Sequence, residues 1–401
     1  MVEPANQEQR EVRSGGTAAR KSVNISPPTC TLHHYISCTE FDIQCAFEVS
    51  LPLLTSYGES LALGAVPRLL RSERITPIYK GGSRGEAKNY RPIALTSNFI
   101  KTLEKIIVSK ITTFLESSNQ LNKGQHSIRW GRSCLSQLLA HHERIVSALE
   151  TNTMLDVIYL DFAKAFDKVD HGVLLHKLRY LGISGRLGFW TSEFLTNRTQ
   201  FVAVGGACSD VSSVVSGIPQ GSVLGPLLFL IHIHDIDHDI THSTITSFAD
   251  DTRISRTINN QDDAVLLQKH FDTIYNMAFK NNKFEHLTYN TNSSAQPTTS
   301  YTAPDGSPIN NPSKVQDLGV CFSSDATFSA HIATTAKKAH SQLGWILRTF
   351  HTRDPYPMLT LYKSLVVRLL EHCCQLWSPW IPGNIRALEA VQRSFTSRII
   401  V

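Results

Sequence analysis

Residues 154–161 read MLDVIYLD, an apolar, strand-forming run that ends on the acid Asp161. Further along the chain, residues 248–251 read FADD and lie between two stretches of β-prone composition. The first pattern predicts a buried strand that ends in an acid, and the second predicts a hairpin with Asp250 and Asp251 at its turn. Acids placed in this way can hold two metal ions that act on a phosphate. Taken alone, FADD is more typical of a solvated Asp-Asp turn than of a metal site.

The composition is that of a globular protein with room for two or three subdomains. The chain has 401 residues, of which 41% are hydrophobic and 18% are charged. Its longest apolar stretch, around residues 227–231, is far shorter than the roughly 20 residues that a membrane-spanning helix needs. The N-terminus has no secretion signal, and the eight cysteines show no zinc-ligand spacing. We therefore expect a reduced, intracellular protein that is not secreted.

Charge is distributed unevenly along the chain. Residues 66–145 hold fourteen Lys and Arg against five Asp and Glu, whereas residues 146–290 hold eleven against sixteen. A basic region followed by an acidic one favours a protein that grips phosphates with the first and metal ions with the second. Solvated helix faces are the alternative explanation.

Periodicity divides the rest of the chain into ordered and irregular parts. Residues 1–45 are polar and predicted to be disordered, and residues 291–313 are predicted to form a loop or a weak hairpin. Apolar residues at helical spacing predict helices over 100–115, 133–149, 339–349, 358–372 and 384–400. The last pattern has no cap after Ile400, so we expect the C-terminus to be a cut rather than a domain end.

The most specific string is SGIPQGSVLGPLLF, residues 216–229. Its glycines and prolines predict a tight loop before an apolar helix, with close backbone approach at Gly217 and Gly221. Gln220 would offer its amide to a base or sugar edge. Phe166, five residues after Asp161, can lie under the ribose of an incoming nucleotide and block a 2′-hydroxyl. The alternative for Phe166 is a simple core position.

Basic side chains surround a glycine-rich turn upstream. The segments PIYKGG (77–82) and NYRPIAL (89–95) place Lys80 and Arg91 where a flap could close over a triphosphate. Arg129 and Arg132 precede a predicted helix, and we predict that they contact the template backbone. A dense group of His and Asp at 232–242 directly follows the predicted helix and matches no zinc spacing, so we interpret it as a polar helix end.

In this order, the segments resemble the reverse transcriptase of non-LTR (LINE-like) retrotransposons of the jockey type, from about residue 47 to the end. The resemblance implies an α+β fold shaped like a right hand, with a small antiparallel palm sheet. It divides the chain into fingers (46–150), palm (151–290), a primer-grip region (291–325) and a helical thumb (326–401).

The resemblance also implies roles for individual residues. Asp161 and Asp250 would bind metal together with the backbone carbonyl of Phe162, and Asp251 would be the supporting acid. Lys283 would protonate the leaving pyrophosphate. Lys80 and Arg91 would bind the triphosphate, and Phe166 would be the sugar gate. Gln220 would contact the nascent pair. The primer-grip hairpin would be formed by Leu318, Gly319 and Val320.

The implied activity is RNA-directed DNA synthesis from dNTPs, on an RNA template and a DNA primer. It would require two Mg²⁺ ions, or Mn²⁺ in their place. The resemblance also implies that the protein acts in the nucleus. The sequence departs from the family pattern at Ser127, Trp130, His232 and His234, and residues 1–45 are too short for the family's upstream endonuclease. We therefore also expect a fragment or a decayed copy, and an inactive remnant that only binds nucleic acid is one alternative. A metal-dependent nuclease is another, although a nuclease needs neither the Gln220 loop nor Lys80 and Arg91.

Overall fold

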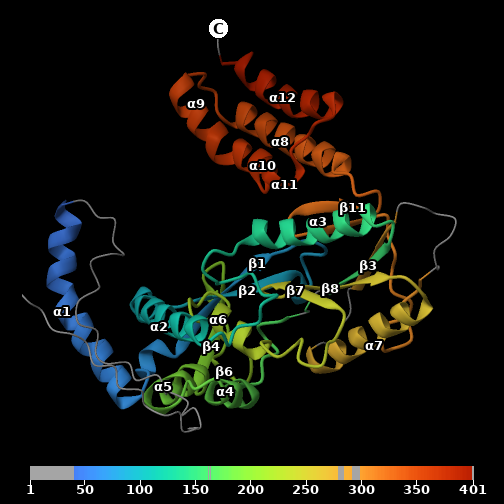
Figure 1. Cartoon of the computed structure of the whole chain (residues 1–401). Helices are drawn as coiled ribbons and strands as arrows, with labels where there is room; N and C mark the ends of the chain where they lie inside the picture. Colours follow the sequence, from blue (N-terminus) through green and yellow to red (C-terminus); the bar gives the residue numbers. More distant parts are fainter. Residues whose placement is uncertain (1–39, 161, 163, 279–283, 291–298, 400–401) are drawn as a thin grey trace, which may run out of the picture.

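The computed structural model describes residues 40–160, 162, 164–278, 284–290 and 299–399 (Figure 1). Asp161 and Lys283 lie outside these ranges, as do residues 1–39. Residues 40–45, which were predicted to be disordered together with 1–39, instead form the start of a helix that continues to Leu63. Among the described helices, none combines the length and the apolar character needed to cross a bilayer.

The fingers consist of helices and one mixed sheet, to which residues 198–214 of the range predicted as palm (151–290) also contribute strands. Its strand order is β2-β1-β4-β5, with β6 also paired to β4; β1 and β2 are antiparallel, and β1 and β4 are parallel. The sheet therefore combines strands from before and after the palm strand that precedes Asp161. The elements are α1 (Glu40–Leu63), β1 (Ser72–Tyr79), β2 (Tyr90–Leu95), α2 (Asn98–Ser117), β4 (Arg198–Val204), β5 (Ala207–Cys208) and β6 (Ser212–Val214).

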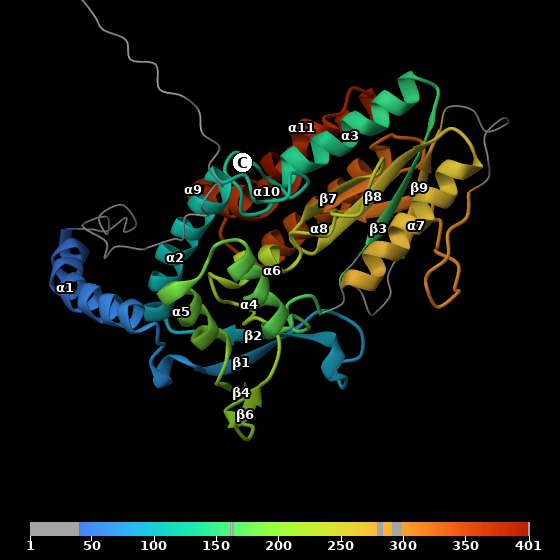
Figure 2. The same ribbon diagram turned by 60° about the horizontal axis from the view of Figure 1, so that its bottom comes forward.

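The palm is a four-stranded antiparallel sheet of order β7-β8-β3-β9. All seven residues of β3 are buried, because α3 covers one face of the sheet and α7 the other (Figure 2). This double cover explains why six of the seven residues of the strand are apolar; the seventh, Asp156, is fully buried, and its Oδ1 lies 3.1 Å from His286 Nε2. The elements are α3 (Cys134–Glu150), β3 (Met154–Leu160), β7 (Thr244–Phe248), β8 (Asp251–Ile258), α7 (Gln261–Ala278) and β9 (Phe284–Tyr289).

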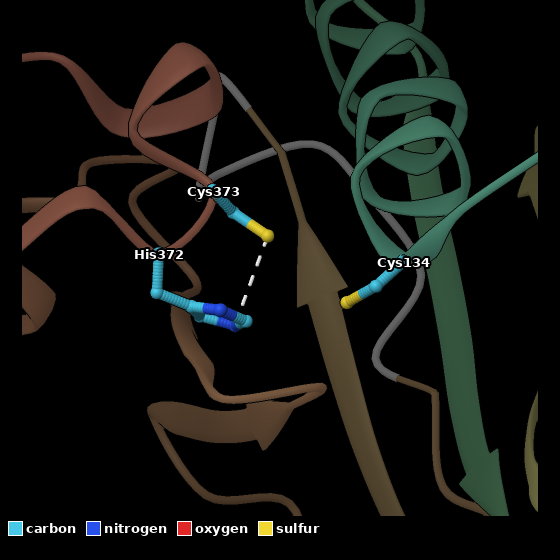
Figure 3. Close-up of side chains that lie close together, drawn as sticks. All are labelled: Cys134, His372 and Cys373. Carbon is cyan, nitrogen blue, oxygen red and sulfur yellow. Dashed lines mark hydrogen bonds between the residues drawn. The ribbon is translucent and has the colours of Figure 1, made fainter. Parts of the chain in front are cut away.

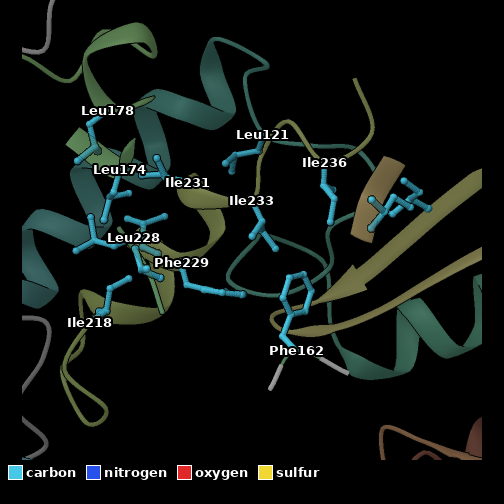
Figure 4. Packing of buried hydrophobic residues seen from close by; sticks show 14 of the residues in the cluster. Leu121, Phe162, Leu174, Leu178, Ile218, Leu228, Phe229, Ile231, Ile233 and Ile236 are labelled. Atoms are coloured by element: carbon cyan, nitrogen blue, oxygen red, sulfur yellow. The ribbon is translucent and has the colours of Figure 1, made fainter. Parts of the chain in front are cut away.

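Three short helices join the fingers to the palm: α4 (His171–Tyr180), α5 (Gly185–Leu195) and α6 (Gly225–His232). Helix α6 is the apolar helix predicted after the loop that contains Gln220, which we call the glutamine loop. Six of the eight residues of α6 are buried. Its side chains meet those of α4 and of Phe162 in the main hydrophobic core (Figure 4).

A hairpin and a helical thumb complete the described chain. The hairpin consists of β10 (Lys314–Asp317) and β11 (Val320–Ser323). The thumb contains α8 (Ser329–Thr349), α9 (Pro355–Tyr362), a π-helical turn (Lys363–Val367), α10 (Arg368–Glu371), α11 (Cys374–Trp377) and α12 (Pro382–Thr396). It has its own core, built on buried residues such as Leu343, Met358 and Val391. Helices α2, α3, α8, α9 and α12 lie where the periodicity predicted helices, and the α+β right-hand fold is confirmed.

Candidate active site

The predicted acids of the FADD segment lie at the tip of the β7–β8 hairpin. Phe248 pairs with Asp251, so Ala249 and Asp250 form the two-residue turn. Ala249 has a φ of +55°, which is unfavourable for a residue with a side chain. Its N–H donates to Gln125 Oε1 at 3.2 Å and to Ser127 Oγ at 3.1 Å. These two buried side chains from the fingers therefore hold the turn that carries the acids.

The same segment of the fingers pairs with β7. His126 N donates to Ser247 O at 2.9 Å, and Ser247 N donates to Gly124 O at 3.0 Å. A Cβ on Gly124 would lie 2.2 Å from the carbonyl oxygen of Ile245, so this approach requires glycine. The hairpin tip is thus fixed by backbone pairing as well as by side chains.

All four palm strands have one end at the edge where the acids lie. The last residue of β3, Leu160, pairs with Thr252 on one side and with Phe284 on the other. Because Thr252 follows Asp251 directly, the C-terminal end of β3 lies beside the hairpin tip. Asp161 follows β3 in sequence and Lys283 precedes β9, but both lie outside the described residues, so their roles stay predictions.

Arg129 and Arg132 have intramolecular partners that the sequence did not reveal. Arg129 makes a two-pronged ion pair with Glu116, at 2.8 Å from Nε and 2.7 Å from Nη2, and also donates to the carbonyl of Asn122. This hydrogen-bonded ion pair lowers the pKa of Glu116. Arg132 donates to the carbonyls of Lys123 and Gln125. Both guanidinium groups therefore shape the loop that supports the acid hairpin, and their contact with a template remains a prediction.

The glutamine loop joins the segment of Phe166 to the fingers. Gln220 Nε2 donates to Asp167 Oδ1 at 2.7 Å, and Ile218 N donates to Phe166 O at 2.8 Å. On the other side, Ala94 N in β2 donates to Gln220 O at 2.7 Å. Both glycines are needed for these approaches, as predicted. A Cβ on Gly217 would lie 2.8 Å from Asp167 O, and one on Gly221 would lie 2.5 Å from Ala94 O.

Glu104 of α2 anchors the far end of this loop. Its Oε2 accepts from Val223 N at 2.5 Å and from Leu224 N at 2.8 Å, at the start of α6. The carboxyl is fully buried; burial raises its pKa, and the two backbone hydrogen bonds partly oppose this. Sequence analysis missed this residue, although an acid on the apolar face of a predicted helix was a signal that could have found it.

Phe166 is half-buried, and its ring stacks on Phe229 with centroids 5.2 Å apart and an interplanar angle of 19°. Phe162 is buried and meets Phe229 edge-on at 5.8 Å (Figure 4). One face of Phe166 therefore belongs to the core while the ring keeps partial exposure. Both the gate and the core interpretation accommodate this position.

Lys80 and Arg91 are exposed on the β1–β2 hairpin of the fingers. Arg91 pairs with Ile78, and Lys80 N donates to Asn89 O at 2.8 Å, just beyond the strand end. The alternation of side chains along paired strands puts both cations on one face of the hairpin. The turn between them is shaped by Gly81 and Gly82, with φ of +139° and +91°. This geometry suits two cations that converge on one polyanion.

A buried arginine ties the acid hairpin to the predicted primer grip. Arg253 in β8 forms an ion pair with Asp317 in β10, and it also donates to Thr246 Oγ1 at 2.9 Å and to Gln137 O at 3.3 Å. Burial lowers the pKa of Arg253 to about 10. Leu318 and Gly319 form the predicted turn between β10 and β11, both with positive φ. The hairpin at Leu318, Gly319 and Val320 is confirmed, and its contact with a primer stays a prediction.

A sequence model described as "Reverse transcriptase (RNA-dependent DNA polymerase)" matches residues 78–319, which is more than half of the chain. The chain belongs to the reverse transcriptase family. The prediction from the motif order is therefore confirmed at the level of the family. Reverse transcriptases generally use divalent metal ions, and they act on a nucleic-acid template and primer with nucleotide substrates.

Its relatives are proteins of mobile elements. The probable RNA-directed DNA polymerase from transposon X-element of Drosophila melanogaster is 26% identical over 79% of this chain and 36% of its own length. The RNA-directed DNA polymerase from mobile element jockey of the same species is 24% identical over 86% of this chain and 39% of its own. The chain thus spans about two-fifths of these relatives. An apo telomerase structure from Candida Tropicalis aligns with a TM-score of 0.44 at 12% identity, covering 70% of this chain and 58% of that one, so the assignment rests on the sequence match.

Proposed function

We propose that this chain is an RNA-directed DNA polymerase of a non-LTR retrotransposon that extends a DNA primer with dNTPs. The observation that carries the proposal is the convergence of three family motifs. The loop of Gln220 connects β2, which bears Arg91, to the segment of Phe166, and the Asp250–Asp251 tip lies at the end of β3. A nuclease needs neither the Gln220 loop nor the cation on β2.

The donor set at the hairpin tip fits a hard divalent cation. Asp250 and Asp251 are adjacent carboxylates on one turn, and carboxylate oxygens are the ligands that Mg²⁺ prefers. We assign Asp161, Asp250 and the Phe162 carbonyl to two Mg²⁺ ions, with Asp251 as the supporting acid. When bound, the ions would activate the attacking oxygen and stabilise charge on the leaving oxygen.

The chain's own residues would position the reactants. Lys80 and Arg91 would hold the triphosphate, and Gln220 would contact the nascent pair. The primer 3′-hydroxyl would pass its proton to solvent water and attack the α-phosphate. A new P–O bond would form as the bond between the α-phosphorus and the oxygen that bridges to the β-phosphate breaks. Lys283 would donate a proton to the departing pyrophosphate.

Primer extension on poly(rA)·oligo(dT) with Mg²⁺ tests the activity. Wild type should extend the primer, Asp250→Asn should abolish extension, and Asp262→Asn, at an exposed acid in the first turn of α7, should leave it unchanged. A well-folded wild type that binds the duplex without extending it would contradict the proposal and support the inactive remnant. Release of nucleotides without any dNTP requirement would support the nuclease.

Phe166→Ala tests the sugar gate in the same assay. Removal of a ring under the ribose should raise rNTP use relative to dNTP, because the exclusion is steric. If Phe166 is only core, the change should cost on the order of 3–5 kcal/mol of stability and leave the rNTP/dNTP ratio unchanged. Incorporation ratio and melting temperature, measured on one variant, separate the two interpretations.

A further inference from the structure

Two cysteines and a histidine meet where α3, the primer-grip turn and the thumb come together (Figure 3). Cys134 is the first residue of α3, whereas His372 and Cys373 connect α10 to α11. The two Sγ atoms and one ring nitrogen of His372 all lie within 4.8 Å of one another. Within the described residues, this is the one such group of potential metal ligands; the His and Asp at 232–242 form none.

The donor types and one of the distances suit a soft divalent cation. Thiolates and imidazole are the ligands that Zn²⁺ prefers in a tetrahedral site. His372 Nε2 and Cys373 Sγ lie 3.7 Å apart. A tetrahedral zinc with usual bond lengths would separate S and N by about 3.6 Å. Cys134 Sγ lies within 4.8 Å of both atoms, so a tetrahedral arrangement requires side-chain shifts of at most about 1 Å, which rotation about single bonds supplies.

One side of this group is buried in the protein, and the other side is exposed to solvent. Cys373 is buried, Cys134 is half-buried and His372 is exposed, so the group opens to solvent on the histidine side. Water can therefore occupy a fourth coordination position. Cys373 has a φ of +53°, a conformation that costs free energy for a non-glycine residue. His372 and Cys373 are consecutive in the sequence, and both belong to the group.

We propose that Cys134, His372 and Cys373 form a binding site for a soft divalent cation of the Zn²⁺ class. Binding removes one proton from each thiol and uses an unprotonated Nε2, with the imidazole proton on Nδ1. The hydrogen bond between Nε2 and Leu318 O, 3.0 Å long, is given up in exchange. The site is distinct from the carboxylate edge and does not depend on the proposed polymerase activity.

The cation would join three elements, which are α3, the primer-grip turn and the base of the thumb. Leu318 O, at the primer-grip turn, lies 3.0 Å from His372 Nε2 and 3.9 Å from Cys134 Sγ. A bound ion would cross-link α3 to the base of the thumb beside this turn.

Titration of the reduced 401-residue protein with Co²⁺, a spectroscopic substitute for Zn²⁺, tests the site. We expect thiolate-to-cobalt charge-transfer absorption at one equivalent, its displacement by Zn²⁺, and a higher melting temperature with Zn²⁺. His372→Ala, at an exposed position, should keep the fold and weaken binding by at least about tenfold. Cys134→Ser and Cys373→Ser should abolish the absorption, whereas Cys374→Ser, next in the chain but outside the group, should retain it.

Two outcomes would overturn the proposal. One is an unchanged cobalt spectrum in Cys134→Ser, Cys373→Ser and His372→Ala, which would assign the binding to other thiols. The other is no cobalt binding by reduced wild type together with a Cys134–Cys373 disulfide after mild oxidation, which would make the pair a redox couple instead. Because His372→Ala leaves both thiols in place, misfolding of a cysteine variant does not obscure the result.

Discussion

The palm and the fingers each contain a buried arginine–carboxylate pair, but the two arginines differ in how many of their N–H groups have hydrogen-bond partners. In the palm, Arg253 pairs with Asp317 and makes further hydrogen bonds to Thr246 and Gln137. In the fingers, Arg198 pairs with Glu73 and donates to Phe194 O, but its Nε has no hydrogen-bond partner among the described residues. Burial also raises the pKa of Glu73 despite its partner.

The two sheets that contain these pairs also differ in how deeply they are buried. Palm strand β3 is buried along its whole length, whereas the fingers hairpin exposes Ile78 at 52% and Leu95 at 51%. We therefore expect the palm sheet to be held more rigidly than the fingers hairpin. Variants that separate stability from nucleotide binding test this contrast.

The largest effect is expected from the palm arginine. Arg253→Met leaves Asp317 buried without its partner and should cost about 3–5 kcal/mol in the free energy of unfolding. Arg198→Met should cost less, because the wild-type fingers already contain an unsatisfied Nε. Urea unfolding of both variants measures the difference. Equal losses would remove the contrast between the sheets, and recovery in Arg253→Met/Asp317→Leu would assign the loss to the orphaned carboxylate.

In the fingers the expected loss is in binding rather than stability. Arg91→Ala removes an exposed cation assigned to the triphosphate. It should raise the KM for dNTP by a factor that corresponds to a loss in binding free energy on the order of 1.5–3 kcal/mol. The melting temperature should barely change. Arg84→Ala, at an exposed arginine of the same turn, is the matched control. An unchanged KM with weaker duplex binding would move Arg91 from the nucleotide to the template.

At the junction of the two regions, Glu104 offers a smaller and more local effect. Glu104→Leu leaves the N–H groups of Val223 and Leu224 without an acceptor and should cost about 1–3 kcal/mol. Glu104→Gln keeps an acceptor oxygen and should restore most of the stability. Since Gln220 lies in the same loop, the Leu variant should also raise the KM for dNTP. A normal KM in a destabilised Leu variant would confine Glu104 to a role in folding.

The smallest effect concerns pH at the base of the thumb. His331 Nδ1 accepts from Cys321 N at 3.3 Å, and burial lowers the pKa of His331 from 6.5 to about 4. The unfolded chain therefore takes up the proton first, so the stability contribution is full above 6.5 and is lost as the pH falls toward 4. His331→Asn keeps an acceptor and does not titrate, so its melting temperature should decline less over this range. Identical declines would exclude His331 as the cause.

Local patterns in the sequence predicted much of this structure. The apolar run before Asp161, the periodicity of α2 and α3, and the glycines of the Gln220 loop each fix a conformation through neighbouring residues, so a single chain reveals them. The β7–β8 hairpin followed from β-prone composition on both sides of FADD. These features were sufficient to predict the family and the edge where the acids lie.

Partners distant in sequence could not be predicted in this way. Nothing in the sequence near Arg129 indicates that its guanidinium forms an ion pair with Glu116. A search for ligands at short, regular spacing likewise cannot find a group that contains Cys134 and Cys373, because these residues are far apart in the sequence. Arg253 and Asp317 are likewise brought together only by the packing of two separate strands. The sequence identifies which groups carry charge, and tertiary structure decides whether that charge meets solvent, substrate or another side chain.

The parallel pairing of β1 with β4 constrains how the protein is made. Ser72 pairs with Thr199, so the fingers hairpin emerges from the ribosome long before the strand that completes its sheet. At about 5–20 residues per second, that interval is on the order of ten seconds. During this time one edge of β1 is open, and long-range pairings of this kind also form slowly. Newly synthesised chains should therefore be most prone to aggregate, and most in need of chaperones, before β4 is complete.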